Sequence, residues 1–182
     1  MIRTGWDQSA PGQLRSAGSG VLISHGAFIA DPGLVTCGDN VRIDPFVYIS
    51  GEVHIGSNVQ ICAGAVLGGS AAGIRLGNWT FVGYGSKLFT GSEDYRYLVN
   101  EAWGASHVDR RPIEFKDFAG VASDVIVMPG VTLNRGVRIG AHSFVYRSPP
   151  GMWALYVGNP LRRIKDVISG ETLAEALDLG DT

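Results

Sequence analysis

An apolar residue returns at every sixth position along most of this chain, and this period limits the possible folds more than any other feature. The first run has six members without interruption: Cys37, Ile43, Ile49, Ile55, Ile61 and Leu67. The period restarts in a new register at Leu76, Val82 and Leu88, and after a gap it resumes at Phe115, Val121, Val127, Leu133, Ile139 and Val145. A repeat this short, sustained over this length, indicates a solenoid of small stacked units.

The second and fifth positions of each unit are restricted too. Gly, Asp or Asn fills the second position, as in Ile55-Gly56-Ser57-Asn58-Val59-Gln60, and these residues tolerate tight turns and left-handed backbone conformations. The fifth position holds a small or β-branched residue, at Val41, Val47, Val53, Val59, Ala65, Thr80, Ser86, Val125, Val131, Val137 and Ser143. We expect the first and fifth positions to face inward, and the repeat to account for the 26 glycines of the chain.

A period of six excludes a helix, which repeats every 3.6 residues, and a simple strand, which alternates every two. Short strands joined by tight corners give this period, and three such sides close a triangular coil of about 18 residues. Stacked coils about 4.8 Å apart pair their strands in parallel. The sequence therefore predicts an all-β parallel β-helix of hexapeptide repeats with some five coils.

The repeat also divides the chain into segments. Residues 1–20 lack the period and are expected to form an irregular lead-in, and residues 21–147 form the β-helix. A long loop excursion at 90–112 interrupts it, and long loops on rigid scaffolds carry function. In the extension 148–182, the stretch Glu171–Leu177 predicts a short helix, because Leu173 and Leu177 have helical spacing.

Bulk composition excludes several classes of protein. A formal net charge of −2 argues against nucleic acid as the main partner, and no apolar run is long enough to span a bilayer. The first residues contain no signal peptide, and two cysteines, Cys37 and Cys62, do not make a disulfide framework. We expect Cys37 to be a buried thiol and the protein to be cytoplasmic.

Three motifs in order give the chain a family resemblance over about residues 20–166. Val127-Met128-Pro129-Gly130-Val131-Thr132 resembles an I-x-P-G-V-T coil, and Ile139-Gly140-Ala141-His142-Ser143-Phe144-Val145 resembles I-G-A-x-S-x-V. The third motif, Gly158-Asn159-Pro160-Leu161-Arg162-Arg163-Ile164-Lys165, resembles G-x-P-A-[KR]-x-I-[KR]. The chain thus resembles hexapeptide-repeat acyltransferases of the galactoside O-acetyltransferase and O-antigen sugar acetyltransferase branch, in which the β-helix is left-handed.

This resemblance implies a homotrimer that transfers an acetyl group from acetyl-CoA to a hydroxyl or amine of a sugar or nucleotide-sugar. The biological setting it implies is the biosynthesis of cell-surface polysaccharide, including lipopolysaccharide. Carried over residue by residue, Ser123 and Ala141 offer backbone groups to the pantetheine arm of the cofactor. Tyr146, Arg147, Arg162 and Lys165 lie near its adenine and phosphates, which agrees with the basic character of this segment.

The chain departs from the family at the general base. Galactoside-type relatives carry a His in a T-G-H-P stretch at the loop entrance, whereas this chain has Thr90-Gly91-Ser92-Glu93-Asp94. Some relatives place a His on the coil after the loop, but Phe118 fills the corresponding position in this chain. Gln60 is likewise not a His. The remaining alternatives for the base are His107 in the loop, and Asp94 or Glu93, since partial burial can raise the pKa of a carboxylate. A further alternative is His142, which occupies an outward position beside Ala141.

The acceptor is not readable from the sequence, nor are O- against N-acylation and the length of the acyl group. Ser92, Tyr95 and Trp103 are candidate acceptor-binding residues, because aromatic side chains stack on sugar rings. His25, His54, His107 and His142 lack the spacing of a three-histidine zinc site, so no metal is expected. The missing loop-entrance His motivates one alternative of another class, a non-catalytic hexapeptide scaffold or assembly protein.

Overall fold

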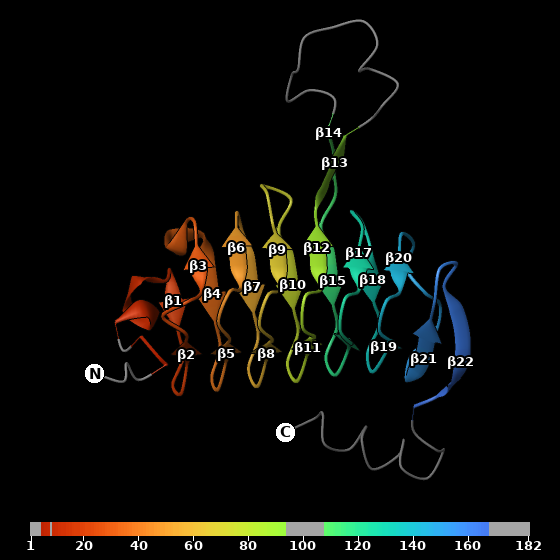
Figure 1. Cartoon of the computed structure of the whole chain (residues 1–182), viewed down its shortest axis with the longest axis horizontal. Coiled ribbons are helices and arrows are strands. Elements are labelled where there is room, and N and C mark those ends of the chain that lie inside the picture. Colours follow the sequence, from red (N-terminus) through yellow and green to blue (C-terminus); the bar gives the residue numbers. More distant parts are fainter. Residues whose placement is uncertain (1–4, 8, 94–107, 168–182) are drawn as a thin grey trace, which may run out of the picture.

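The computed structural model describes residues 5–7, 9–93 and 108–167, and in them the chain winds into a solenoid of three parallel sheets (Figure 1). Sheet I consists of β1 (Ser16–Ala17), β4 (Val35–Cys37), β7 (Val53–Ile55), β10 (Ile74–Leu76), β15 (Ile113–Phe115) and β18 (Thr132–Leu133). Sheet II consists of β2 (Leu22–Ile23), β5 (Arg42–Ile43), β8 (Gln60–Ile61), β11 (Phe81–Val82), β16 (Gly120–Val121), β19 (Arg138–Ile139), β21 (Ala154–Val157) and β22 (Arg162–Asp166). Sheet III consists of β3 (Phe28–Ile29), β6 (Tyr48–Ser50), β9 (Val66–Gly68), β12 (Lys87–Phe89), β17 (Ile126–Val127) and β20 (Phe144–Val145).

The coil length agrees with the six-residue period. The hydrogen-bonded residues Thr36 and His54 of neighbouring coils lie 18 residues apart. The separation grows to 21 between Ser57 and Asn78, because an outward bulge at residues 69–73 lies between them. Across the long excursion it reaches 39, between Asn78 and Asp117. The solenoid has about six turns, and the predicted parallel β-helix is confirmed.

The ends of the solenoid extend further than the repeat indicates. Two short 3₁₀ helices, η1 (Ala10–Gln13) and η2 (Pro32–Leu34), lie near the N-terminal end, and β1 within the expected lead-in already pairs with β4. In the C-terminal extension, β21 continues sheet II in parallel and β22 returns antiparallel to it. The helix predicted at 171–177 lies outside the described residues.

The predicted inward positions form the core. Every first-position residue of the three runs is buried, and so is every fifth-position residue, including the polar Thr80, Ser86 and Ser143. The hydroxyls of these three donate to backbone carbonyls, of Gly77, Ala122 and Gly140 respectively. Burying a polar group without such a bond is costly, so the three hydroxyls are accommodated in the column without an unsatisfied donor.

The reason for glycine at the second position differs from our expectation. Gly56 and Gly77 are absent from the residues with positive φ, and the left-handed residues are at the fourth position, Asn58 and Trp79. A Cβ on Gly56 would lie 2.7 Å from Asn78 Oδ1, and that oxygen accepts a hydrogen bond from Ser57 N at 2.8 Å. Glycine is therefore required for the close approach of the next coil's side chain, which links the corners between sheets I and II.

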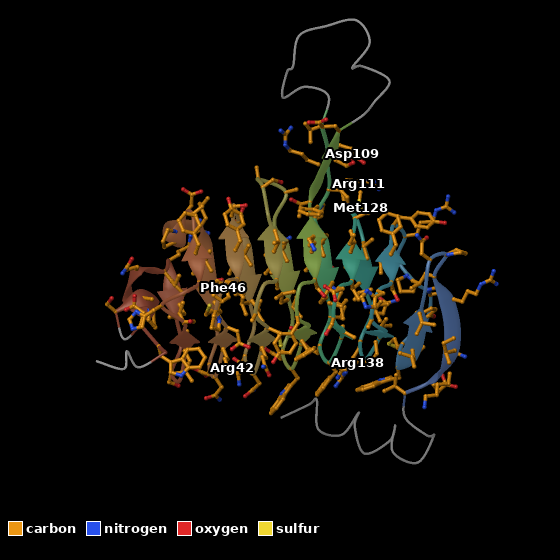
Figure 2. The ribbon with its side chains drawn as sticks, in the orientation of Figure 1. Arg42, Phe46, Asp109, Arg111, Met128 and Arg138 are labelled. Atoms are coloured by element: carbon orange, nitrogen blue, oxygen red, sulfur yellow. The ribbon has the colours of Figure 1, made fainter. Side chains whose placement is uncertain are left out.

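Side chains stand outward from all three sheets (Figure 2). On sheet II, the Arg42 guanidinium binds the buried carboxylate of Asp44 through two bonds, Nε to Oδ1 at 2.6 Å and Nη2 to Oδ2 at 3.0 Å. A buried carboxylate needs such compensation, because desolvation disfavours its charge. Cys37 and Cys62 are buried free thiols, and burial raises the pKa of Cys37 to about 12, as expected for a structural cysteine.

The interior column predicts a large difference between inward and outward apolar residues. We expect Ile61→Ala to reduce the free energy of unfolding by about 2–5 kcal/mol, because Ile61 is fully buried and its truncation leaves a cavity. Leu22→Ala is the matched control, since Leu22 faces outward and is 41% exposed. Urea titration followed by circular dichroism measures both, and equal effects would contradict the assignment of faces.

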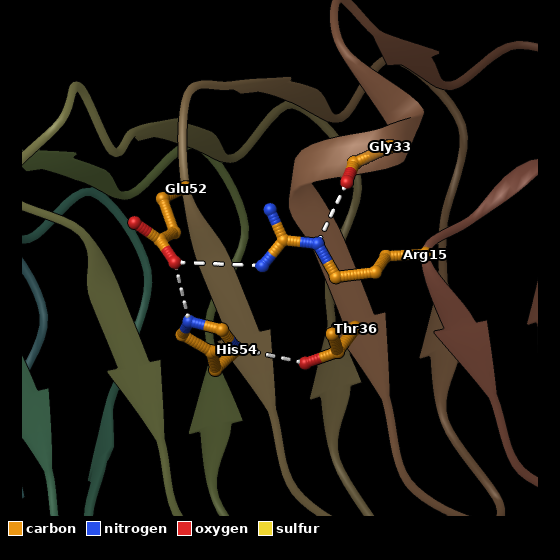
Figure 3. Close-up of polar contacts among 5 residues, drawn as sticks. All are labelled: Arg15, Gly33, Thr36, Glu52 and His54. Atoms are coloured by element: carbon orange, nitrogen blue, oxygen red, sulfur yellow. Dashed lines mark hydrogen bonds and ion pairs between the residues drawn. The ribbon is translucent and has the colours of Figure 1, made fainter.

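A polar network links three coils on the outside of sheet I (Figure 3). Glu52 Oε1 lies 3.0 Å from His54 Nε2 and 3.5 Å from Arg15 Nη1, and His54 Nδ1 lies 3.0 Å from Thr36 Oγ1. Arg15 Nε also donates to Gly33 O at 2.8 Å. A neutral His54 with its proton on Nε2 donates to Glu52 and accepts from Thr36. The hydrogen bond from His54 holds the pKa of Glu52 below its ordinary value of 4.5, and Arg15 adds to this in the same direction.

This network predicts an acid-dependent part of the stability. A carboxyl whose pKa is lower in the folded state stabilises the fold above about pH 4.5, and this contribution disappears as the pH falls through the lowered pKa. We expect Glu52→Gln to lower the thermal midpoint at pH 7, and this loss to become smaller as the pH falls below 4.5. Glu114→Gln, also on sheet I, is the control for the loss of one charge, and an effect of Glu52→Gln that does not diminish with falling pH would count against the network.

Candidate active site

The long excursion leaves the solenoid as an antiparallel hairpin at the corner between sheets III and I (Figure 1). Its arms are β13 (Gly91–Glu93) and β14 (Val108–Arg110), and Ser92 is paired with Asp109. The hairpin projects away from the solenoid, so its arms hold Ser92 and Glu93 outside the coil from which they emerge. Ser92 is half-buried and Glu93 is exposed.

Thr90 fixes the foot of this hairpin to the preceding coil. Its side chain is completely buried, and its Oγ1 lies 2.6 Å from Gly69 O, 2.8 Å from Gly68 O and 2.7 Å from Ser70 Oγ. The Thr90 carbonyl accepts a hydrogen bond from Arg111 N at 3.0 Å. The bulge that resets the register thus also provides the acceptors that anchor the excursion.

An ion pair lies at the base of the returning arm. Arg111 donates to Asp109 through Nε at 3.0 Å and Nη2 at 2.7 Å, a two-pronged geometry with more directional strength than a single contact (Figure 2). The Arg111 side chain also covers Gly130 of the next coil, where an added Cβ would lie 2.8 Å from Nη1. No role was predicted for Arg111 from the sequence. The spacing of Asp109 and Arg111, two residues apart as on one face of a strand, is the signal that could have indicated this ion pair.

A hollow of about 500 Å³ lies at the foot of the hairpin. Small residues of three coils and the two hairpin arms line it: Ser50, Gly51, Gly68, Ser70, Phe89, Gly91, Ser92, Glu93, Val108 and Arg110. It presents hydroxyls, one carboxylate and one aromatic ring, a combination that suits a sugar. Two of the predicted site residues, Ser92 and Glu93, therefore share one hollow, whereas Asp94, Tyr95, Trp103 and His107 lie outside the described residues.

The predicted cofactor residues lie along a different corner, between sheets II and III. Ser123 and Ala141 occupy successive turns of this corner, which is connected by hydrogen bonds between coils, including His142 N to Ser123 O at 3.0 Å. The ladder ends at Ala141: no described residue donates a hydrogen bond to its carbonyl, which is available as an acceptor.

The remaining predicted cofactor residues gather where this corner ends. Tyr146 stacks on Phe144 at 5.9 Å between centroids, and the Arg147 guanidinium lies 5.2 Å from the Tyr146 ring. A hollow of about 250 Å³ is lined by Tyr146, Arg147, Ser148, Pro149, Pro150, Tyr156, Pro160 and Leu161. Arg162 and Lys165 follow on β22 and are exposed, with no ion pair among the described residues. This end of the solenoid is thus a basic surface beside a small cavity.

The two sets of residues are not brought together within one chain. The hairpin leaves at the corner between sheets III and I, and Ser123 and Ala141 lie at the corner between sheets II and III, so sheet III separates them. Within the residues that the structure describes, no group of three His, Cys, Asp or Glu side chains could hold a metal ion. The same part of the chain contains no helix long and apolar enough to cross a membrane.

Comparison with known proteins agrees with these features. The family model "Bacterial transferase hexapeptide (six repeats)" matches residues 35–69. A putative colanic acid biosynthesis acetyltransferase, WcaF of Escherichia coli K12, is 27% identical over 158 residues, which are 85% of this chain and 70% of that protein. AntD, an N-acyltransferase from Bacillus cereus in complex with dTDP and 3-hydroxybutyryl-CoA, is 28% identical over 97% of both chains, with a TM-score of 0.85. The chain thus carries a bacterial transferase hexapeptide repeat and is similar to sugar acyltransferases built on this repeat over most of its length.

A more distant structure shows the same fold in this family. PerB from Caulobacter crescentus, in complex with CoA and GDP-perosamine, is 23% identical to this chain, with a TM-score of 0.63. The alignment covers 81% of this chain and 58% of the PerB chain. At this identity the likeness concerns the solenoid alone. The comparisons thus agree with the resemblance of this chain to hexapeptide-repeat acyltransferases.

The Thr90 anchor predicts how firmly the hairpin is attached. We expect Thr90→Val to reduce the free energy of unfolding by about 0.5–1.5 kcal/mol, because it preserves shape but removes the hydroxyl hydrogen bonds, while Gly68 O and Gly69 O keep the backbone N–H groups of Thr90 and Gly73. Thr132→Val is the matched control, since Thr132 faces outward from sheet I and its side chain forms no hydrogen bond with a described residue. Limited proteolysis within the excursion should also become faster in Thr90→Val, and an unchanged cleavage rate would show that the anchor does not hold the hairpin.

Proposed function

We propose that this protein transfers an acyl group from an acyl-CoA thioester, such as acetyl-CoA, to a hydroxyl or amine of a sugar or nucleotide-sugar. The observation that carries the proposal is the likeness to AntD, which extends over nearly the whole of both chains. AntD binds CoA together with dTDP-4-amino-4,6-dideoxyglucose in a related structure. The similarity to WcaF supports a place in the biosynthesis of cell-surface polysaccharide such as lipopolysaccharide, and with it a cytoplasmic location.

The corner between sheets II and III is the proposed donor site. A pantetheine arm carries two amides, and an extended arm along this corner would meet the turn backbones of Ser123 and Ala141. No described residue donates to the Ala141 carbonyl, so this carbonyl is free to accept from a pantetheine N–H. Hydrogen bonds to backbone groups fix the position of the thioester without depending on side chains.

The basic end of the solenoid is the proposed site for the nucleotide part of CoA. CoA carries several negative charges, and Arg147, Arg162 and Lys165 surround or follow the hollow beside Tyr146. Arginine binds phosphate through two parallel N–H groups and lysine as a point charge. An adenine ring could stack on the Tyr146 ring, which also contacts the Arg147 guanidinium.

The hollow at the foot of the hairpin is the proposed acceptor site, with Ser92, Tyr95 and Trp103 as acceptor-binding residues. Acyl transfer requires a base that removes a proton from the attacking hydroxyl or amine. Glu93 lines this hollow, and Asp94 and His107 are close to it in sequence, so these three residues are the proposed candidates for the base.

Assembly as a homotrimer would complete the site. In one chain the hairpin and the donor corner belong to different corners of the solenoid. A second copy placed against sheet III would bring its hairpin hollow beside the donor corner of the first. The acyl group and the base would then come from different subunits.

Three substitutions test the choice of base: Glu93→Gln, Asp94→Asn and His107→Gln. We expect one of them to lower kcat by about 10²–10⁴-fold while CoA binding is unchanged, because general-base catalysis contributes about that factor. Release of free thiol from acetyl-CoA with a panel of amino-sugar nucleotides measures turnover, and Glu114→Gln serves as control. Full turnover in all three variants would reject the proposed base, and absence of turnover in the unmodified protein would favour the scaffold alternative.

Charge removal at the basic end tests the donor site. We expect Arg162→Gln and Lys165→Gln each to raise the KM for acetyl-CoA about tenfold without a comparable change in kcat, because a remote phosphate contact supports binding more than chemistry. Lys116→Gln on sheet I removes the same charge elsewhere and should have no effect. A KM that is insensitive to both substitutions would place CoA somewhere other than this end of the solenoid.

A further inference from the structure

A second hollow, which takes no part in the proposed acyl transfer, lies on the outside of sheet I toward its corner with sheet II. It measures about 590 Å³ and extends over four coils, from His54 to Met152. Its volume falls within the range of small-molecule sites in proteins. None of its lining residues belongs to the hairpin hollow or to the donor corner.

The charges around this hollow are only partly balanced. Lys116 Nζ lies 2.6 Å from Glu114 Oε1, and Asp117 Oδ1 accepts a hydrogen bond from Asn78 N at 2.7 Å. The exposed guanidinium of Arg75 stands between these groups and His54, and it forms no ion pair or hydrogen bond with any described residue. Its cross-strand neighbour Glu114 pairs with Lys116 instead, so the Arg75 guanidinium lines the hollow without an ion pair and is suited to bind an anion.

Two buried donors at the same edge also lack an acceptor. Arg135 Nε, from the lining, and Trp153 Nε1, next to the lining residue Met152, have no hydrogen-bond partner within the described part of the chain. Both side chains are held in place by Phe118, which lies 5.3 Å from the Arg135 guanidinium and 5.6 Å from the Trp153 ring. These two nitrogens are themselves covered, but Arg135 lines the hollow and forms no ion pair with a described residue, so its guanidinium is a second uncompensated cation there.

We propose that this hollow is a second binding site, separate from the acyl-transfer site, for a small phosphate-bearing molecule. A phosphate group offers several acceptor oxygens on one centre and can meet the fork of Arg75 while another oxygen accepts from a terminal nitrogen of the Arg135 guanidinium. The volume leaves room for a sugar or nucleoside attached to the phosphate. A bound ligand would contact coils on both sides of the excursion in the sequence. The lining includes residues of β7 and β10, which precede the excursion, and the corner after β18, which follows it.

Isothermal titration of the full chain with inorganic phosphate, glucose 1-phosphate and adenosine monophosphate, each alone, tests the site. We expect at least one of them to bind, and Arg75→Gln to weaken that binding at least tenfold while thiol release from acetyl-CoA stays unchanged. Arg15→Gln is the matched control, because Arg15 lies on the same side of the solenoid but outside the hollow. Binding of the phosphate esters without inorganic phosphate would show that the attached sugar or nucleoside contributes to affinity.

Other results would overturn the proposal. Absence of binding by all three probes, or binding that survives both Arg75→Gln and Arg135→Gln, would show that the hollow is not the site. Loss of probe binding in the presence of CoA would place the probes in the donor site. A change of molecular mass in solution on Arg75→Gln would identify the hollow as a contact between copies of the chain. Failure of the acyl-transfer assay would leave this binding test unaffected, since it uses no acyl donor.

Discussion

The column of apolar side chains inside the solenoid is the interaction on which the rest of the structure depends. Each coil contributes one large residue from each sheet, such as Ile61 and Leu88, and these residues are fully buried. A fully buried side chain of this size stabilises by about 1.5–3 kcal/mol, and the column repeats this contribution coil after coil. Because each coil packs only on its neighbours, the column fixes the corners in straight lines, and the proposed donor corner and hairpin foot inherit their positions from it.

Features that look like interruptions are attached to this frame by specific hydrogen bonds. The bulge at 69–73 offers carbonyls to Thr90, so the hairpin starts from a fixed point although it projects outward. The last rung of the donor corner shows the opposite case, since no described residue donates a hydrogen bond to the Ala141 carbonyl. A missing hydrogen bond at an otherwise continuous corner is thus a local cause of binding capacity.

Much of the fold could be predicted because a period of six has few structural solutions. All residues expected at the first and fifth positions of the repeat are buried. Even the polar Thr80 and Ser143 are buried, and their hydroxyls donate hydrogen bonds to backbone carbonyls. The reason given for the second-position glycines was wrong: Gly56 is needed for the approach of Asn78, and Asn58 takes the left-handed conformation. The strands β21 and β22 were missed because they lie beyond the repeat, where pairing depends on the exposed edge of sheet II rather than on a sequence period.

By itself, the sequence determined the solenoid, its coil length and the place of the excursion, since local spacing decides which side chains can face inward together. Only the tertiary structure decided which distant residues share a space: Ser92 and Glu93 with Ser50 and Ser70 at the hairpin foot, and Arg75 with Arg135 on sheet I. These groupings depend on how many residues separate neighbouring coils, 18, 21 or 39, and so on the lengths of the bulge and the excursion. Stacking in three dimensions converts those lengths into neighbours, and no short-range pattern in the sequence contains that information.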